Sequence, residues 1–124
     1  MSEPEAPILD EGVLADLSAS VNGDRAFVVE LIEAFLADGA QQLAAIDAAR
    51  IADDAEAMVR PAHTLKSSSA TVGAMRLSAA ARELEMAGRS GRLDEATSGR
   101  VAGLHTDWGA TSSALRIWVS GGER

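Results

Sequence analysis

The sequence predicts an all-α protein, and two observations lead to that prediction. The first is composition: 47% of the 124 residues are hydrophobic, yet there are only two Phe, two Trp and no Tyr. Much of the hydrophobic fraction is alanine and leucine, which favour helices, whereas the β-branched and aromatic residues that favour strands are fewer. The second is spacing, because apolar residues recur at three- and four-residue intervals, as they do on the buried face of a helix. Together these patterns predict an up-down antiparallel four-helix bundle with a short additional N-terminal helix.

The first residues precede the bundle. Residues 1–9 contain two prolines, and we expect them to form a flexible N-terminal arm. The chain length suits one domain, which we place at residues 10–120. Asp10 can cap a short helix that runs to about Ser18, because its side-chain oxygen can accept a hydrogen bond from a free backbone N–H of the first turn.

Four further helices are predicted by the same spacing. Their expected ranges are residues 25–50, 55–72, 74–87 and a last helix from about residue 93. Two of them follow residues whose side chains can cap a first turn, namely Asp24 or Asn22 and then Asp53 or Asp54. Gly73 can end the third helix, because glycine readily adopts the left-handed conformation that closes a helix. The connections are short, so neighbouring helices should run antiparallel.

Composition also limits the kinds of partner. The formal net charge is −8, with 19 acidic and 11 basic residues, and no basic stripe with interleaved aromatic residues offsets the repulsion from DNA or RNA. There are no cysteines, which excludes disulfides and thiolate metal sites. No segment approaches the roughly 20 apolar residues of a membrane span, and the acidic N-terminus is unlike a secretory signal. We therefore expect a cytoplasmic monomer that binds proteins or small molecules, with no nucleic-acid or membrane partner and no metal.

The third predicted helix carries a histidine on its solvent side. At about 100° per residue, one face should line the core, with the residues Met58, Ala62, Leu65, Ser69 and Val72. His63 is turned well away from that face, and Lys66 and Ser67 lie one turn further along the same strip. A neutral imidazole is a good nucleophile near pH 7. A phosphoryl group on it would bring about 1.5–2 negative charges, which Lys66 could balance with help from Arg60 one turn earlier.

Simpler explanations exist for these residues. From the helical pattern alone, His63 could be an ordinary surface histidine and Lys66 a solubilising charge. A zinc site is poorly supported, since the other histidine, His105, belongs to a different helix and there is no cysteine. Glu85 and Arg89 are four residues apart in the order that favours a helical ion pair, so a surface pair is the simple explanation for both.

A longer set of residues resembles a known family, the histidine phosphotransfer (HPt) domains. Their signature, H-x-L-K-G-S-x-x-x-x-G, is similar to the stretch His63-Thr64-Leu65-Lys66-Ser67-Ser68-Ser69 followed by Gly73-Ala74. The similarity covers about residues 10–119 and continues on the next helix through Leu77, Leu84, Glu85 and Arg89. The set is more specific than a histidine and a lysine at helical spacing, and it favours a functional role for His63.

This resemblance implies a place in a phosphorelay. His63 would accept a phosphoryl group on its exposed ring nitrogen from the phospho-aspartyl receiver domain of a hybrid histidine kinase. It would pass that group reversibly to the receiver domain of a response regulator. Lys66 would neutralise the phosphate, and Arg89 could reach toward it from the next helix. The domain would need no cofactor and no ATP site, and Mg²⁺ would come with the receiver.

The resemblance also marks a receiver-facing surface and two departures. The candidate phosphate- or receiver-facing residues are Arg60, Thr64, Ser67, Ala70 and Arg89. Apolar residues of the first helix, such as Val13 and Leu17, could extend this surface. Ser67 stands where the family usually has glycine, which adds a small side chain at the closest approach. Pro61 lies inside the predicted helix, where it either positions the imidazole or is a tolerated kink.

Two other functions are compatible with a helical bundle. One is a non-catalytic module that binds a receiver and sequesters or inhibits a response regulator. The presence of both His63 and Lys66 argues against it. The other is a histidine-kinase dimerisation domain, but the chain has neither a glycine-rich nucleotide motif nor the length for an ATP-binding domain.

Overall fold

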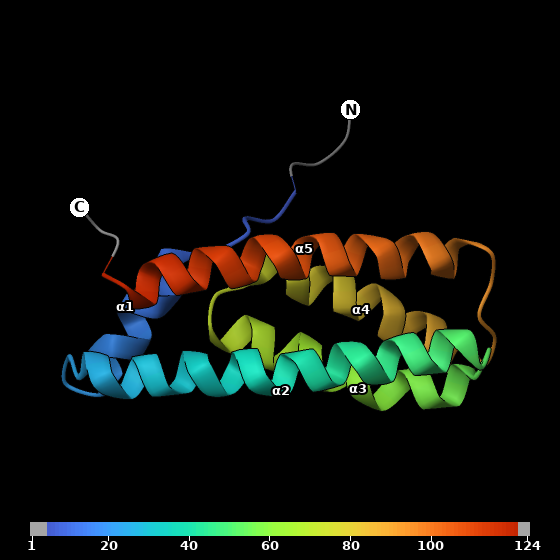
Figure 1. Cartoon of the computed structure of the whole chain (residues 1–124), viewed down its shortest axis with the longest axis horizontal. Coiled ribbons are helices and arrows are strands. Elements are labelled where there is room, and N and C mark those ends of the chain that lie inside the picture. Colours follow the sequence, from blue (N-terminus) through green and yellow to red (C-terminus); the bar gives the residue numbers. More distant parts are fainter. Residues whose placement is uncertain (1–4, 122–124) are drawn as a thin grey trace.

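The computed structural model describes residues 5–121, and these fold into helices without any strand (Figure 1). The helices are α1 (Glu11–Ser20), α2 (Arg25–Ile51), α3 (Ala55–Thr71), α4 (Met75–Arg89) and α5 (Ala96–Val119). The predicted all-α class is therefore confirmed.

Helices α2 to α5 form the four-helix bundle, and α1 lies at the end of the bundle where α2 begins and α5 ends (Figure 1). Helix α3 packs against α2 on one side and α4 on the other, and α5 packs against both α4 and α2. The connections are short, so sequential helices run antiparallel. The predicted up-down bundle with one additional N-terminal helix is confirmed. Within residues 5–121, no helix is both long and apolar enough to cross a lipid bilayer.

Three aspartates start the first three helices. Asp10, Asp24 and Asp54 each accept a hydrogen bond from a backbone N–H of the first turn, at 3.0, 3.1 and 3.0 Å. Such caps satisfy donors that have no partner inside the helix. The alternative candidates, Asn22 and Asp53, have left-handed backbones, with φ of 59° and 54°, and so form the connections instead.

Gly73 joins α3 to α4 and also allows α1 to dock there. Its φ is +83°, a conformation that favours glycine. A Cβ at this position would lie 2.6 Å from the backbone oxygen of Asp10 and 3.2 Å from Cβ of Val13. The Asp10 N–H donates a hydrogen bond of 2.7 Å to the Gly73 carbonyl. The absence of a side chain at Gly73 therefore allows the start of α1 to pack against the α3–α4 turn, where this hydrogen bond holds it.

The segment before α1 lies along the start of α4. Arg76 donates from its backbone N–H to the Pro7 carbonyl at 3.0 Å and from Nε to the Ala6 carbonyl at 2.8 Å. Residues 5–9 are thus connected to the bundle by hydrogen bonds. Residues 1–4 lie outside the described part of the chain, and the flexibility of the arm stays a prediction.

The core is aliphatic, with one aromatic contact at its edge. Its largest fully buried apolar side chains are Leu14, Val28, Ile32, Ile46, Met58, Leu65, Val72, Leu77, Leu84, Leu104 and Leu115. Phe35 of α2 is buried and packs against the half-buried Trp108 of α5, with ring centroids 5.6 Å apart. A Cβ on Gly39 would lie 2.5 Å from the Trp108 ring, so a glycine in the middle of α2 makes room for the indole.

The last two helices differ slightly from their predicted ranges. Helix α4 continues about two residues further, to Arg89, because Gly88 remains helical and Gly91 makes the left-handed turn, with φ of +85°. Helix α5 begins at Ala96, about three residues later than expected. The Ala96 N–H donates to the Asp94 carboxylate at 3.0 Å, which stabilises a turn before the helix starts.

Candidate functional site

His63 projects from the middle of α3 toward solvent. Its side chain is 53% exposed, as the helical pattern predicted. The opposite face of α3 is buried as expected, with Met58, Ala62, Leu65 and Ser69 fully buried and Val72 1% exposed. Pro61 is also buried, inside the helix two residues before the histidine. The imidazole is therefore exposed on a helix whose opposite face is buried in the core.

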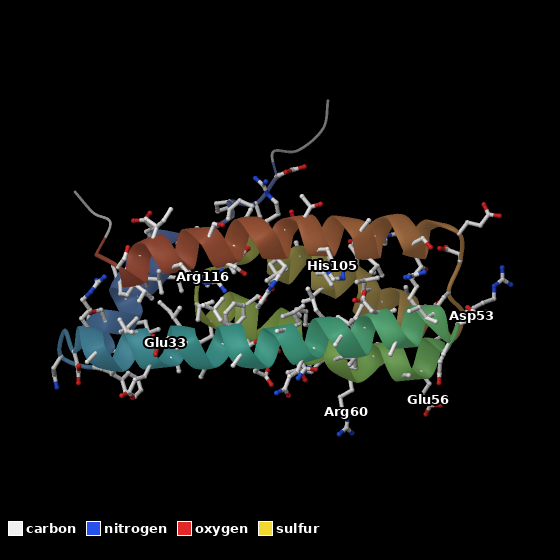
Figure 2. The ribbon with its side chains drawn as sticks, in the orientation of Figure 1. Glu33, Asp53, Glu56, Arg60, His105 and Arg116 are labelled. Atoms are coloured by element: carbon white, nitrogen blue, oxygen red, sulfur yellow. The ribbon has the colours of Figure 1, made fainter. Side chains whose placement is uncertain are left out.

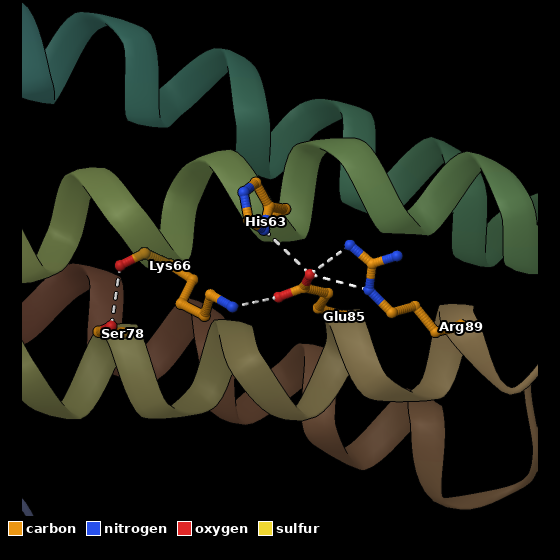
Figure 3. A network of polar contacts seen from close by, with 5 residues as sticks. All are labelled: His63, Lys66, Ser78, Glu85 and Arg89. Carbon is orange, nitrogen blue, oxygen red and sulfur yellow. Dashed lines mark hydrogen bonds and ion pairs between the residues drawn. The ribbon is translucent and has the colours of Figure 1, made fainter.

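Glu85 of α4 lies opposite His63 and joins three side chains (Figure 3). Its Oε2 is 3.0 Å from Nδ1 of His63 and 2.7 Å from Nη2 of Arg89, and its Oε1 is 2.6 Å from Nζ of Lys66. The Glu85 side chain is only 6% exposed. Between the same two helices, the Ser78 hydroxyl donates to the Lys66 carbonyl at 2.8 Å. This cluster holds α3 and α4 in register at the level of the histidine.

Glu85 is a charged group despite its burial. Its hydrogen bonds with Lys66, Arg89 and His63, the first being the largest effect, lower its pKa from 4.5 to about 2, although burial alone would raise it. The carboxylate is therefore ionised at neutral pH. An ionised carboxylate accepts hydrogen bonds and donates none.

The charge on Glu85 selects one tautomer of His63. Because the carboxylate can only accept, Nδ1 of the imidazole must carry the proton in the contact between them. In the neutral ring, the other nitrogen, Nε2, then keeps its lone pair. A neutral imidazole with one nitrogen anchored and the other free is arranged for nucleophilic attack through Nε2.

The structure corrects the simple explanation given for Glu85 and Arg89, and it adds a partner for Lys66. The Lys66 ammonium is paired with Glu85, and its side chain is 30% exposed. The helical ion pair between Glu85 and Arg89 is confirmed, at 2.7 Å. Its interpretation as a surface pair is wrong, since Glu85 is buried and also binds His63. A sequence signal existed, because Glu85 follows Leu84 and lies at the edge of the buried stripe of α4.

Comparisons with known proteins identify the family to which the chain belongs. The model of the Hpt domain family matches residues 30–113, well over half of the chain. This protein belongs to the Hpt domain family. The crystal structure of histidine-containing phosphotransfer protein B (HptB) from Pseudomonas aeruginosa PAO1 is similar, with a TM-score of 0.83 and 27% sequence identity. The match covers 94% of this chain and 97% of the HptB chain. A search of curated proteins finds no match.

As an Hpt domain, the protein is a phosphotransfer protein of phosphorelays. The remaining predicted site residues can now be placed around its histidine. Ser67 is exposed on α3, and Thr64 and Ala70 are half-buried there. Arg60 is exposed and projects away from the bundle (Figure 2), so it does not join the cluster around Glu85.

The second histidine of this Hpt domain lies elsewhere. His105 is on α5, where its Nε2 is 2.9 Å from the Asp47 carboxylate of α2 (Figure 2). Its side chain is 46% exposed, close to the exposure of His63. The two histidines thus use opposite ring nitrogens in their carboxylate contacts. His105 therefore serves as an internal comparison for His63.

Proposed function

We propose that His63 accepts a phosphoryl group on Nε2 from the phospho-aspartate of a receiver domain and transfers it to the aspartate of a second receiver. The donor in this proposal is the receiver of a hybrid histidine kinase, and the acceptor is that of a response regulator. The observation that carries the proposal is the anchoring of Nδ1 by Glu85 at 3.0 Å on a half-exposed ring. That contact leaves Nε2 as the available nucleophile.

The bonds formed and broken in the transfer involve only His63, the phosphoryl group and the receiver aspartate. The Nε2 lone pair attacks phosphorus, the bond from phosphorus to the aspartyl oxygen breaks, and its electron pair leaves with the carboxylate. The return step is the reverse, with an aspartate oxygen attacking phosphorus and the phosphorus–nitrogen bond breaking. We expect Mg²⁺ to enter with the receiver, where it would neutralise charge on the transferring group.

Lys66 supports the charge of the phosphoryl group in this proposal. The group adds about 1.5–2 negative charges near the Glu85 carboxylate. Lys66 has three N–H donors, of which its 2.6 Å contact with Glu85 occupies one. The other donors can bind phosphoryl oxygens without breaking the ion pair. Ser67, one turn after His63, adds a hydroxyl at the surface that the receiver would approach.

A label-transfer experiment tests the proposed function. Receiver domains from the same organism would be phosphorylated with radiolabelled donor and mixed with the parent chain, His63→Gln and His105→Gln. Because His105 is similarly exposed and also paired with a carboxylate, its variant is a matched control. We expect acid-labile label on the parent and on His105→Gln, and none on His63→Gln. Label on His63→Gln, or on none of the three, would contradict the proposal.

A further inference from the structure

We propose that Glu85 keeps the proton on Nδ1 of His63 while the phosphoryl group is attached to Nε2. The phosphoryl group would then always leave from a protonated ring. This inference deepens the proposed function and rests on His63 being the phosphorylated residue. It assigns Glu85 a positioning role that depends on its negative charge, beyond the orientation that a neutral acceptor could give.

The geometry of Glu85 suits this role. Its Oε2 contacts Nδ1 at 3.0 Å, while its Oε1 is held by Lys66 at 2.6 Å and its Oε2 also by Arg89 at 2.7 Å. The side chain is 6% exposed, so water screens the contact weakly. These contacts involve the side of the ring that carries Nδ1, so they can persist when a group is added at Nε2.

The chemistry explains why the proton matters. When Nε2 attacks phosphorus and the proton stays on Nδ1, the ring becomes a cation facing the Glu85 carboxylate. When an acceptor carboxylate then attacks phosphorus, the electron pair of the phosphorus–nitrogen bond returns to Nε2 and a neutral imidazole leaves. If Nδ1 had lost its proton first, the same step would expel an imidazolate anion, which is a far poorer leaving group. Loss of that proton therefore limits the pH range over which the phosphoryl group can depart.

The neighbouring charges determine whether replacing Glu85 raises or lowers the pH at which the Nδ1 proton is lost. Lys66 of α3 and Arg89 of α4 face Glu85, and both would oppose a positive charge on the ring. Among residues 5–121, α1, α2 and α5 contribute no ion pair to this carboxylate. While Glu85 is charged, its carboxylate partly offsets the two cations and is itself the group that contacts Nδ1, at 3.0 Å. In Glu85→Gln the two cations would remain beside the ring without that compensation, so the Nδ1 proton should be lost at lower pH.

Titration of the phosphorylated protein tests this inference. The full chain, labelled with ¹⁵N-histidine, would be phosphorylated with phosphoramidate, a chemical donor that requires no receiver. The ¹⁵N signal of Nδ1 would be followed against pH in the parent, Glu85→Gln and Glu83→Gln. Glu83 is an exposed residue of the same helix, 3.9 Å from Arg100, so its variant removes the same charge away from the site.

The expected result is a midpoint for loss of the Nδ1 proton about one pH unit or more lower in Glu85→Gln than in the parent. Glu83→Gln should match the parent. Equal midpoints in the parent and Glu85→Gln would overturn the inference. Titration of the phosphorylated parent in denaturant gives a second reference that needs no variant, and its midpoint should also lie below that of the folded parent. If phosphoramidate labels His63 while no receiver does, the proposed function fails and the titration still decides the role of Glu85.

Discussion

Three donors share the carboxylate of Glu85, and this sharing determines how single substitutions will act at the site. Lys66, Arg89 and His63 each contact it within 3.0 Å. Removing one donor leaves the carboxylate with two others, whereas removing the carboxylate leaves all three without their common partner. Substitutions of the donors and of the acceptor should therefore have different effects on stability and on phosphoryl transfer.

Lys66→Ala should slow transfer while the fold is kept. We expect a rate about tenfold lower, which corresponds to roughly 1.4 kcal/mol of lost transition-state stabilisation. Stability should fall by only about 1–2 kcal/mol, because Arg89 and His63 still bind Glu85. Rapid-quench transfer from a labelled receiver and urea unfolding measure the two effects, with Lys66→Arg as the variant that keeps the charge. Transfer at the parental rate, or an unfolded variant, would show that the role of Lys66 is misassigned.

Acid should remove the stabilisation that Glu85 provides. Its pKa is about 2 in the folded protein and near 4.5 without the partners, so the ionised group stabilises the fold fully above about pH 4.5. That contribution, about 3 kcal/mol, should be lost as the pH falls from 4.5 toward 2. Urea unfolding of the parent and Glu85→Gln should show a gap in unfolding free energy that narrows below pH 4.5. A gap that stays constant with pH would contradict this, and Glu83→Gln should show little gap at any pH.

At the scale of the helices, local features of the chain were predictable, and contacts between helices were not. The caps act within a few residues of their own position, so spacing identified Asp10 and narrowed the other two caps to a choice between neighbouring residues, and Gly73 was identified as the end of α3. The pattern of α4 places Glu85 only at the edge of the buried stripe, and its nearly complete burial depends on the neighbouring helix α3. The sequence predicted that this helix ends at about Ala87, which places Gly88 in the turn that follows. In the structure it is a helical residue at the contact with α3.

Gly88 sets how closely α4 approaches α3, so enlarging it should disturb the site. A Cβ there would lie 2.8 Å from the backbone oxygen of Ala55 and 2.8 Å from Cγ2 of Val59. We expect Gly88→Ala to destabilise the fold by about 1–3 kcal/mol and to slow transfer by moving Glu85 away from His63. Gly99→Ala is the matched control, because a Cβ at that helical position meets nothing within 4 Å. It should instead stabilise the fold by up to about 1 kcal/mol, as measured by thermal unfolding. Equal effects of the two substitutions would contradict this account.

For the whole molecule, the attachment of α1 to the α3–α4 turn determines where the apolar residues of α1 lie on the bundle. Val13 lies against Gly73 at the end of α3, and it and Leu17 are half-buried. Apolar residues that remain partly exposed can contribute to a contact with a partner. Their position relative to His63 follows from the fold and could not be deduced from either helix alone.

Val13→Ala and Leu17→Ala should each weaken receiver binding by about fivefold, or roughly 1 kcal/mol. Ile117→Ala provides the comparison, because this residue is 59% exposed on α5. Affinities measured by titration calorimetry, together with urea unfolding to check stability, would separate lost binding from lost folding. Parental affinity in both α1 variants would remove α1 from the docking surface.

The most direct test of the central claim is to locate the phosphoryl group on the ring after transfer from a receiver. Coupling between ³¹P and ¹⁵N in histidine-labelled protein identifies the bonded nitrogen. Because Nδ1 of His63 is held by Glu85, we predict that phosphorus is bonded to Nε2 of His63. Phosphorus bonded to Nδ1, or to any atom of another residue, would contradict the account.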